Sequence, residues 1–122
     1  MTGGAQILLV DDSESDRALY REWLESFGYE VIEAEDGDDA LRLCVEQEPA
    51  CIVTDFLMLR KDGFQLLVEL RRVKRMDTPV IFMTEHQSSE IIEDAMALGA
   101  SAFVAKQDLT QDSLHKMITD LI

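Results

Sequence analysis

The sequence predicts an α/β fold in which helices cover both faces of a doubly wound, five-stranded parallel sheet. Short apolar runs alternate with stretches whose apolar residues recur at helical spacing, as in repeated βα units. The runs are apolar at nearly every position, which is typical of strands buried on both faces. Right-handed crossovers favour the strand order 2-1-3-4-5.

Polar residues, glycine or proline bound the expected strands, which cover residues 6–10, 29–34, 50–55, 80–83 and 102–105. The run at 29–34 has more polar positions than the others, as an edge strand would. Ser13 or Ser15 can cap the first helix, with the acids Glu14 and Asp16 in its first turn. Leu19 is one of the apolar residues that recur at helical spacing along this helix, and Gly28 is well placed to stop it.

The second helix is expected to open at Asp38 or Asp39 and to carry Val45 among its apolar residues. The third covers about 64–73. The basic residues at its end are expected to complete a helix C-terminus, and a docking patch is the alternative. The fourth lies between the last two strands. The fifth places His115 on its outer surface, because its inward-facing residues are Leu114, Met117, Ile118 and Leu121.

Size and composition predict one domain over residues 1–122, with residues 1–5 as a flexible lead-in. The net charge of -14 argues against direct contact with nucleic acid, since phosphate contacts need Lys and Arg. No apolar stretch approaches the ~18 residues that span a bilayer. Cys44 and Cys51 are expected to be buried thiols of a cytoplasmic protein.

Each apolar run of the central sheet is followed by a polar side chain: Asp11 and Asp12, Asp55, Thr84, or Lys106. Ligands of open α/β sheets bind outside the carboxyl ends of the strands. If the strands are parallel neighbours, these five side chains meet at one site. A carboxylate that closes a buried strand is costly unless something binds it, which makes Asp55 the central candidate.

Three carboxylates in one small site repel each other and favour a hard cation such as Mg²⁺, which often binds together with a phosphate. Thr84 and Lys106 could then hold phosphoryl oxygens while an aspartate accepts the phosphoryl group. Structural alternatives exist for each residue taken alone. Asp11 or Asp12 could cap the following helix, Thr84 could bond a neighbouring backbone group, and Lys106 could simply pair with Asp55.

The set of motif residues resembles the receiver domain of two-component response regulators over essentially the whole chain. The matching residues, in order, are Asp11-Asp12, Asp55, Asp62-Gly63, Thr84 and Lys106. The resemblance implies a flavodoxin- or CheY-like three-layer sandwich. It also implies a signalling domain rather than an ordinary enzyme. The only chemistry of such a domain is its own phosphorylation and dephosphorylation.

By this resemblance, Asp55 accepts a phosphoryl group from a histidine kinase or a phosphotransfer protein. Mg²⁺ or Mn²⁺ would bind Asp12 directly, Asp11 through water, Asp55, and the backbone carbonyl of Leu57. Thr84 and Lys106 would hold the phosphoryl oxygens.

Phe103 occupies the family's switch-aromatic position, where its ring would follow an inward movement of Thr84. This movement would change the face formed by the fourth helix, fifth strand and fifth helix, which controls a partner or an attached output domain. A fixed core aromatic is the alternative role for Phe103. The sequence leaves homodimerisation open.

Several positions depart from the family pattern. Gln107 stands where proline often follows the lysine, so we expect a trans Lys106–Gln107 peptide. Glu85 replaces a small residue and would repel an incoming phosphodonor. Leu57 and His86 stand at positions that tune the lifetime of the phosphoryl group in the family, although a solvated loop residue is an equal alternative for His86.

Two other functions remain as alternatives. A degenerate receiver would bind partners without being phosphorylated. A haloacid-dehalogenase-type phosphatase also uses an Asp nucleophile, Mg²⁺, Thr and Lys, but its Asp-x-Asp motif is absent after the first run, and the chain has no room for a cap insertion.

Overall fold

The computed structural model describes residues 4–57, 61–85 and 88–122. Five strands form one parallel sheet: β1 (Gln6–Val10), β2 (Glu30–Ala34), β3 (Cys51–Asp55), β4 (Val80–Thr84) and β5 (Ala102–Ala105). The longer helices are α1 (Glu14–Ser26), α2 (Gly37–Gln47), α3 (Gly63–Val68), α4 (Ser89–Ala97) and α5 (Gln111–Leu121). A π-helical segment, η1 (Glu69–Val73), continues α3, and a 3-10 turn, η2 (Lys106–Asp108), follows β5.

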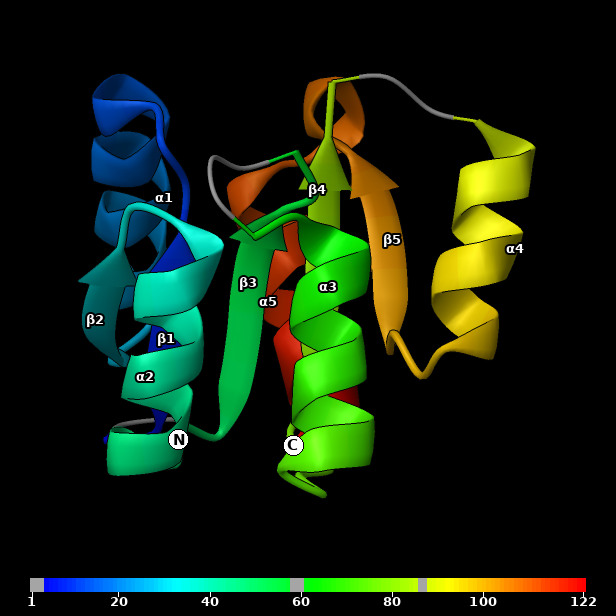
Figure 1. Cartoon of the computed structure of the whole chain (residues 1–122). Helices are drawn as coiled ribbons and strands as arrows, with labels where there is room; N and C mark the ends of the chain where they lie inside the picture. The colour runs from blue at the N-terminus through cyan, green and yellow to red at the C-terminus, as the bar shows by residue number, and fades with distance from the viewer. Residues whose placement is uncertain (1–3, 58–60, 86–87) are drawn as a thin grey trace.

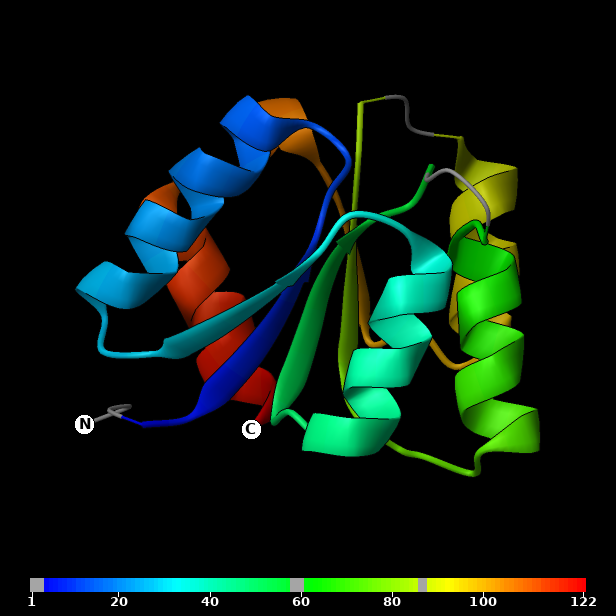
Figure 2. The same cartoon turned by 60° about the vertical axis from the view of Figure 1, so that its left-hand side comes forward.

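The sheet order is β2-β1-β3-β4-β5, as the sequence predicts, and β2 lies at one edge. Helices α1 and α5 cover one face of the sheet, and α2, α3 and α4 cover the other (Figures 1 and 2). The result is the expected three-layer sandwich. All strand arrows point to the same end of the sheet (Figure 1), so the residues that follow β1, β3, β4 and β5 are brought to one edge.

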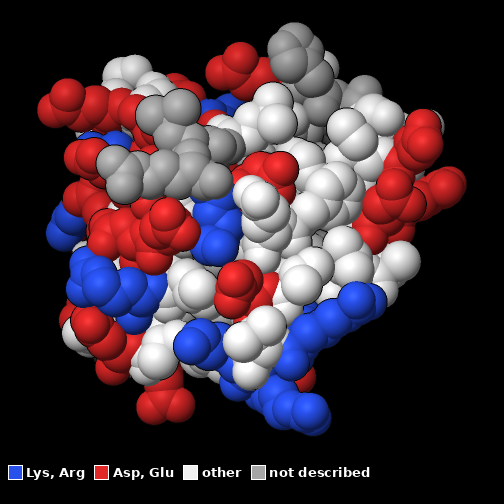
Figure 3. Space-filling view, viewed as in Figure 1, with Lys and Arg blue, Asp and Glu red and all other residues white. Residues whose placement is uncertain are grey.

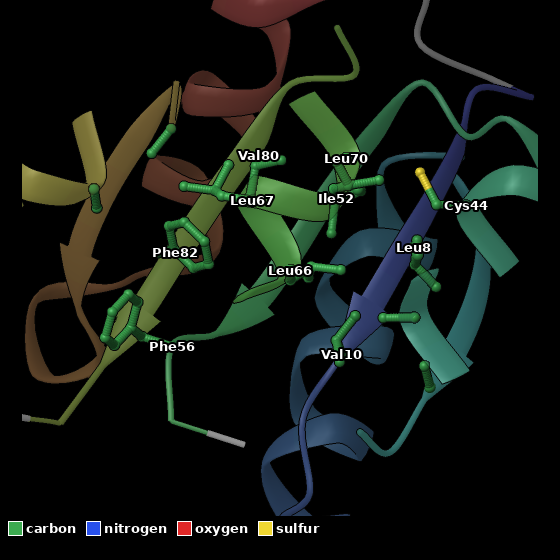
Figure 4. Packing of buried hydrophobic residues seen from close by; sticks show 14 residues of the cluster. Leu8, Val10, Cys44, Ile52, Phe56, Leu66, Leu67, Leu70, Val80 and Phe82 are labelled. Atoms are coloured by element: carbon green, nitrogen blue, oxygen red, sulfur yellow. The ribbon is translucent and has the colours of Figure 1, made fainter. Parts of the chain in front are cut away.

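Alternate residues of the central strands pack into two separate hydrophobic clusters. Leu8 and Ile52 face α2 and α3, whereas Ile7 and Val53 face α1 and α5. Figure 4 shows the first cluster, in which Phe56 and Phe82 lie beside the leucines of α3. Both sheet faces are therefore dry, which explains why the strand sequences are apolar at successive positions.

Side-chain caps fix where the helices start. The Ser13 hydroxyl accepts a hydrogen bond from the Asp16 backbone N–H, so Ser13 is the cap of α1. The second helix begins earlier than expected, at Gly37. Its cap is Asp36 rather than Asp38 or Asp39, because the Asp36 side chain accepts from the Asp39 N–H at 2.8 Å.

Two apolar helix residues are exposed, and one predicted side-chain orientation, that of His115, is wrong. Leu19 is 43% exposed, and Tyr20 takes the buried position next to it. Val45 is 44% exposed on α2. His115 is half-buried rather than on the outer surface, because its ring stacks on Phe27 with a centroid separation of 3.9 Å.

The basic residues after α3 do not share one role. The Arg71 guanidinium is half-buried and donates to the carbonyl oxygens of Gly99 and Met76, at 2.9 and 2.8 Å, so it ties η1 to the segment before β5. Arg72, Lys74 and Arg75 are exposed. Basic side chains gather below α3 at the lower right of Figure 3, whereas acidic ones cover the left side of that face.

Both cysteines are buried and free, as predicted. Within the described part of the chain, no helix has the length and apolar character that a membrane crossing requires. The Lys106–Gln107 peptide is trans, as the absence of proline predicts.

Candidate functional site

The candidate site lies at the carboxyl edge of the sheet. Asp11 and Asp12 follow β1, Asp55 is the last residue of β3, Thr84 is the last residue of β4, and Lys106 follows β5. The parallel register aligns these strand ends, with Asp55 opposite Met83 and Thr84 opposite Ala105. The sheet itself thus brings together residues that are far apart in the sequence.

The Asp55 side chain is only 14% exposed and contacts two donors. Its Oδ1 accepts from the Leu57 backbone N–H at 3.3 Å, and its Oδ2 lies 3.4 Å from the Lys106 Nζ. Burial, with a further contribution from the negative charge of Asp11, raises the pKa of Asp55 to about 6, although Lys106 and the Leu57 N–H act in the opposite direction. Ionised Asp55 is therefore an unfavourable state that a bound cation would relieve.

Lys106 is the cation at the centre of the site, and its side chain is 9% exposed. Its Nζ lies 2.9 Å from Asp11 Oδ2, 2.9 Å from Asp16 Oδ2 and 3.4 Å from Asp55 Oδ2. Burial alone would lower the pKa of Lys106, but hydrogen bonds to Asp16 and Asp11 and the charges of Asp55 and Asp11 raise it above its ordinary value. The ammonium group is thus held in its charged form.

A potential metal site is formed by Asp11, Asp12 and Asp55, since one carboxylate oxygen from each lies within 4.8 Å of the others. Asp11 is fully buried, Asp55 is partly buried, and Asp12 is exposed. Asp11 is also fixed locally, because its Oδ1 accepts from the Ser13 backbone N–H at 2.9 Å. Hard oxygen donors at this spacing, open to solvent on the Asp12 side, suit a cation such as Mg²⁺ that keeps part of its water shell.

A small cavity of about 250 Å³ opens beside Asp55. Its other lining residues are Asp12, Leu57, Thr84 and Glu85. Thr84 is buried, whereas Glu85 is exposed and Leu57 is 60% exposed. The cavity offers room for a group attached to Asp55, with the Glu85 carboxylate near its entrance. His86, the other predicted tuning residue, lies outside the described residues.

Phe103 is half-buried on β5 and packs against two aromatic rings. Its ring centroid lies 5.3 Å from that of Phe56 and 5.8 Å from that of Phe82. Phe56 directly follows Asp55, and Phe82 precedes Thr84 by two positions on β4. The Phe103 ring therefore packs against β4 and against the residue that follows β3, and its switch role stays a prediction.

The loop after β3 is held against the start of α2. A Cβ atom on Gly37 would lie 2.1 Å from the backbone oxygen of Lys61, so only glycine fits there. The Lys61 Nζ also lies 3.6 Å from Asp38 and 3.5 Å from Glu69. These contacts fix the far end of the loop that begins with Leu57.

One residue of the site was missed by sequence reasoning. Asp16, in the first turn of α1, was interpreted only as an acid that favours a helix N-terminus, yet it contacts Lys106 as closely as Asp11 does. The available signal was the Ser13 cap, which places Asp16 in the turn nearest the end of β1. We call Asp11, Asp12, Asp16, Asp55 and Lys106 the site cluster.

Comparisons with known proteins show which family the chain belongs to. The model of the response regulator receiver domain family matches residues 7–119. The chain is similar to the transcriptional regulatory protein SrrA of Staphylococcus aureus, with 33% identity over 101 residues, which is 83% of this chain and 41% of SrrA. The match thus spans about two fifths of the length of that curated relative.

Solved structures give the same result. The chemotaxis protein CheY4 of Vibrio cholerae has a TM-score of 0.88 and 29% identity, over 98% of this chain and 100% of that chain. The receiver domain of the Francisella response regulator 1452 has a TM-score of 0.88 and 26% identity, over 97% of this chain and 96% of that chain. Since the family model covers nearly the whole sequence, the chain belongs to the response regulator receiver domain family.

Proposed function

We propose that this receiver domain is a phosphorylation-controlled switch that takes up a phosphoryl group on Asp55. The observation that carries the proposal is the placement of the Lys106 Nζ 3.4 Å from Asp55, beside a trio of acids that can share a cation. A lone structural ion pair would need neither the extra acids nor the adjoining cavity.

Asp55 would act as the nucleophile. Its Oδ forms a bond to phosphorus as the bond from phosphorus to the donor's leaving group breaks, and the leaving group departs with the electron pair. The transferred group would occupy the cavity lined by Thr84, where the hydroxyl can donate to one phosphoryl oxygen. Lys106 would donate to another oxygen and offset its charge.

Asp11, Asp12, Asp55 and the backbone carbonyl of Leu57 would hold Mg²⁺, or Mn²⁺ in its place. When bound, the ion supplies positive charge that offsets the carboxylates and the phosphoryl oxygens. The acid trio fits this role because its oxygens are hard donors that lie within one ion's reach of each other.

Phosphorylation would change the positions of Thr84 and Phe103. A phosphoryl group that draws the Thr84 hydroxyl inward would free space for the Phe103 ring and alter the face formed by α4, β5 and α5. A downstream partner or an attached output domain would bind that face. The relative SrrA is a transcriptional regulatory protein longer than the matched part, which supports an attached output domain as one arrangement.

The phosphodonor would be a histidine kinase or a histidine phosphotransfer protein. The excess of acidic residues, 25 against 11 Lys and Arg, supports a protein partner rather than direct binding of nucleic acid by this domain. A cytoplasmic location remains a prediction from the sequence.

Phosphate-affinity electrophoresis tests this function. The protein is incubated with acetyl phosphate and Mg²⁺, and a slower band that disappears with time is expected. No shifted band under any condition would indicate an interaction module that is never phosphorylated. Steady hydrolysis of p-nitrophenyl phosphate, many turnovers per protein, would instead indicate a phosphatase.

A further inference from the structure

Lys106 is shared unequally among three carboxylates. An ammonium group has three N–H donors, and here three aspartates lie close enough to take them. The two shorter distances, each 2.9 Å, lead to Asp11 and Asp16 on the α1 side of the site. The reactive residue Asp55 has the longest distance, 3.4 Å.

Asp16 differs from Asp11 in how firmly it is held. The Asp11 side chain is fully buried, and its second oxygen is bonded to the Ser13 N–H. The Asp16 side chain is 33% exposed, so water can replace Lys106 as its partner at lower cost. Of the two short contacts, the one to Asp16 is therefore the easier to release.

Asp16 is also outside the potential metal site. The oxygens that can share a cation belong to Asp11, Asp12 and Asp55. A cation bound there would weaken the attraction of Lys106 to Asp11 and Asp55, since it would take up part of their charge. The charge of Asp16 would remain available to Lys106.

We propose that Asp16 is a positioning residue that holds Lys106 toward α1 and competes for it with the phosphoryl group on Asp55. The inference rests on the proposed function and concerns the regulation of the same site. To reach a phosphoryl oxygen, Lys106 must redirect a donor from one of its carboxylates. The contact to Asp16 thus slows phosphoryl uptake and weakens binding of the transferred group.

The test compares Asp16→Asn with Glu14→Gln. Asn keeps the size of the side chain, and the Ser13 cap binds the backbone of residue 16, so α1 should still form. Glu14→Gln removes an exposed acid from the same turn and provides a matched loss of charge. Acetyl phosphate should label Asp16→Asn about fivefold faster than the parent, equivalent to about 1 kcal/mol, and Glu14→Gln at the parent rate.

A second readout separates positioning from general stability. Beryllium trifluoride mimics the phosphoryl group, and its dissociation constant should fall about fivefold in Asp16→Asn and stay unchanged in Glu14→Gln. The NMR signal of the Lys106 ammonium group in metal-free protein should shift in Asp16→Asn alone.

Three results would overturn the inference: equal labelling of Asp16→Asn and the parent, slower labelling of the variant, or the same acceleration in Glu14→Gln. Failure of the proposed function looks different, because the parent itself would then take up no phosphoryl group. If the parent takes up no phosphoryl group, Asp16 has no phosphoryl group to compete with for Lys106, and the inference fails too, whether or not the ammonium signal shifts.

Discussion

Two ionic clusters lie side by side near the ends of β1 and β2, and they differ in their balance of charge. In the arginine network, defined as Arg17, Arg21, Glu25, Glu33 and Glu35, two guanidinium groups meet three carboxylates. The Arg17 Nε lies 2.7 Å from Glu33, and Arg21 pairs with the other Glu33 oxygen. In the site cluster, four carboxylates lie around the single ammonium of Lys106, which contacts three of them, Asp11, Asp16 and Asp55.

The two clusters differ in how much negative charge is left without a cation. The arginine network has one excess negative charge, and its outer carboxylates, Glu25 and Glu35, are 51% and 79% exposed, so water solvates them. The site cluster has excess negative charge in a partly buried place, and the raised pKa of Asp55 reflects this cost. Arg17 joins the two, since its Nη1 donates to the Asp11 backbone oxygen at 2.7 Å. The larger and more buried excess of negative charge in the site cluster supports the proposal that a cation binds there.

The largest expected effect comes from removing the shared ammonium. Lys106→Met would leave Asp11, Asp16 and Asp55 without their cation, and the free energy of unfolding of metal-free protein should fall by about 3 kcal/mol at neutral pH. Arg21→Met is the control, because its side chain is 38% exposed and its loss should cost less than about 1 kcal/mol. Urea unfolding in EDTA measures both. Equal losses would mean that the two clusters do not differ in the way described.

Addition of Mg²⁺ should change the stability slightly less than Lys106→Met does. At a Mg²⁺ concentration about a hundred times its dissociation constant, the parent should gain about 2.7 kcal/mol of stability. Asp12→Asn should lose most of this gain, whereas Asp38→Asn, an exposed acid at the start of α2, should keep it. A gain of the same size in Asp12→Asn would exclude this acid as a ligand.

The ionisation of Asp55 should make the stability depend on pH, and this effect is the next in size. Because its pKa in the folded protein is about 6 instead of 3.8, its ionisation opposes folding. Metal-free Asp55→Asn should therefore be more stable than the parent by about 2 kcal/mol above pH ~6, and the difference should shrink to zero as the pH falls toward about 4. Thermal unfolding across this range in EDTA measures it. A difference that grows toward low pH would contradict the sign.

The smallest effect concerns the entrance of the cavity. Removal of the Glu85 carboxylate should reduce repulsion of an anionic donor, and Glu85→Ala should be labelled by acetyl phosphate about twofold faster at low salt. Glu90→Ala, an exposed acid in the first turn of α4, is the control and should be labelled at the parent rate. Equal rates for Glu85→Ala and the parent would exclude this role for Glu85.

Much of the fold could be predicted because the relevant signals are local. The central strands are largely apolar runs, the edge strand β2 is more polar, and the strand order follows from the handedness of the crossovers. The residues at the strand ends were identified for the same reason: Asp55 and Thr84 close two runs, and parallel packing does the rest. The placement of Asp55 and Thr84 at the edge of the sheet can therefore be predicted from the sequence.

The errors arise where contacts between elements far apart in the sequence determine the position of a side chain. His115 was expected on the surface, but Phe27 stacks on it and Tyr29 bonds its ring nitrogen at 3.1 Å, across the gap between α1 and α5. Asp16 was interpreted as a helix-end acid because its partner Lys106 is 90 residues away. No local pattern distinguishes an acid that only favours a helix N-terminus from one that also meets a distant lysine.

The central claim is that Asp55 accepts a phosphoryl group in a cluster that needs a cation. Intact-mass spectrometry of the parent and of Asp55→Asn, each incubated with acetyl phosphate in Mg²⁺ or in EDTA, tests it most directly. We expect a single phosphoryl group on the parent in Mg²⁺, little in EDTA, and none on Asp55→Asn. Equal uptake by Asp55→Asn, or uptake by the parent that is unaffected by EDTA, would contradict the account.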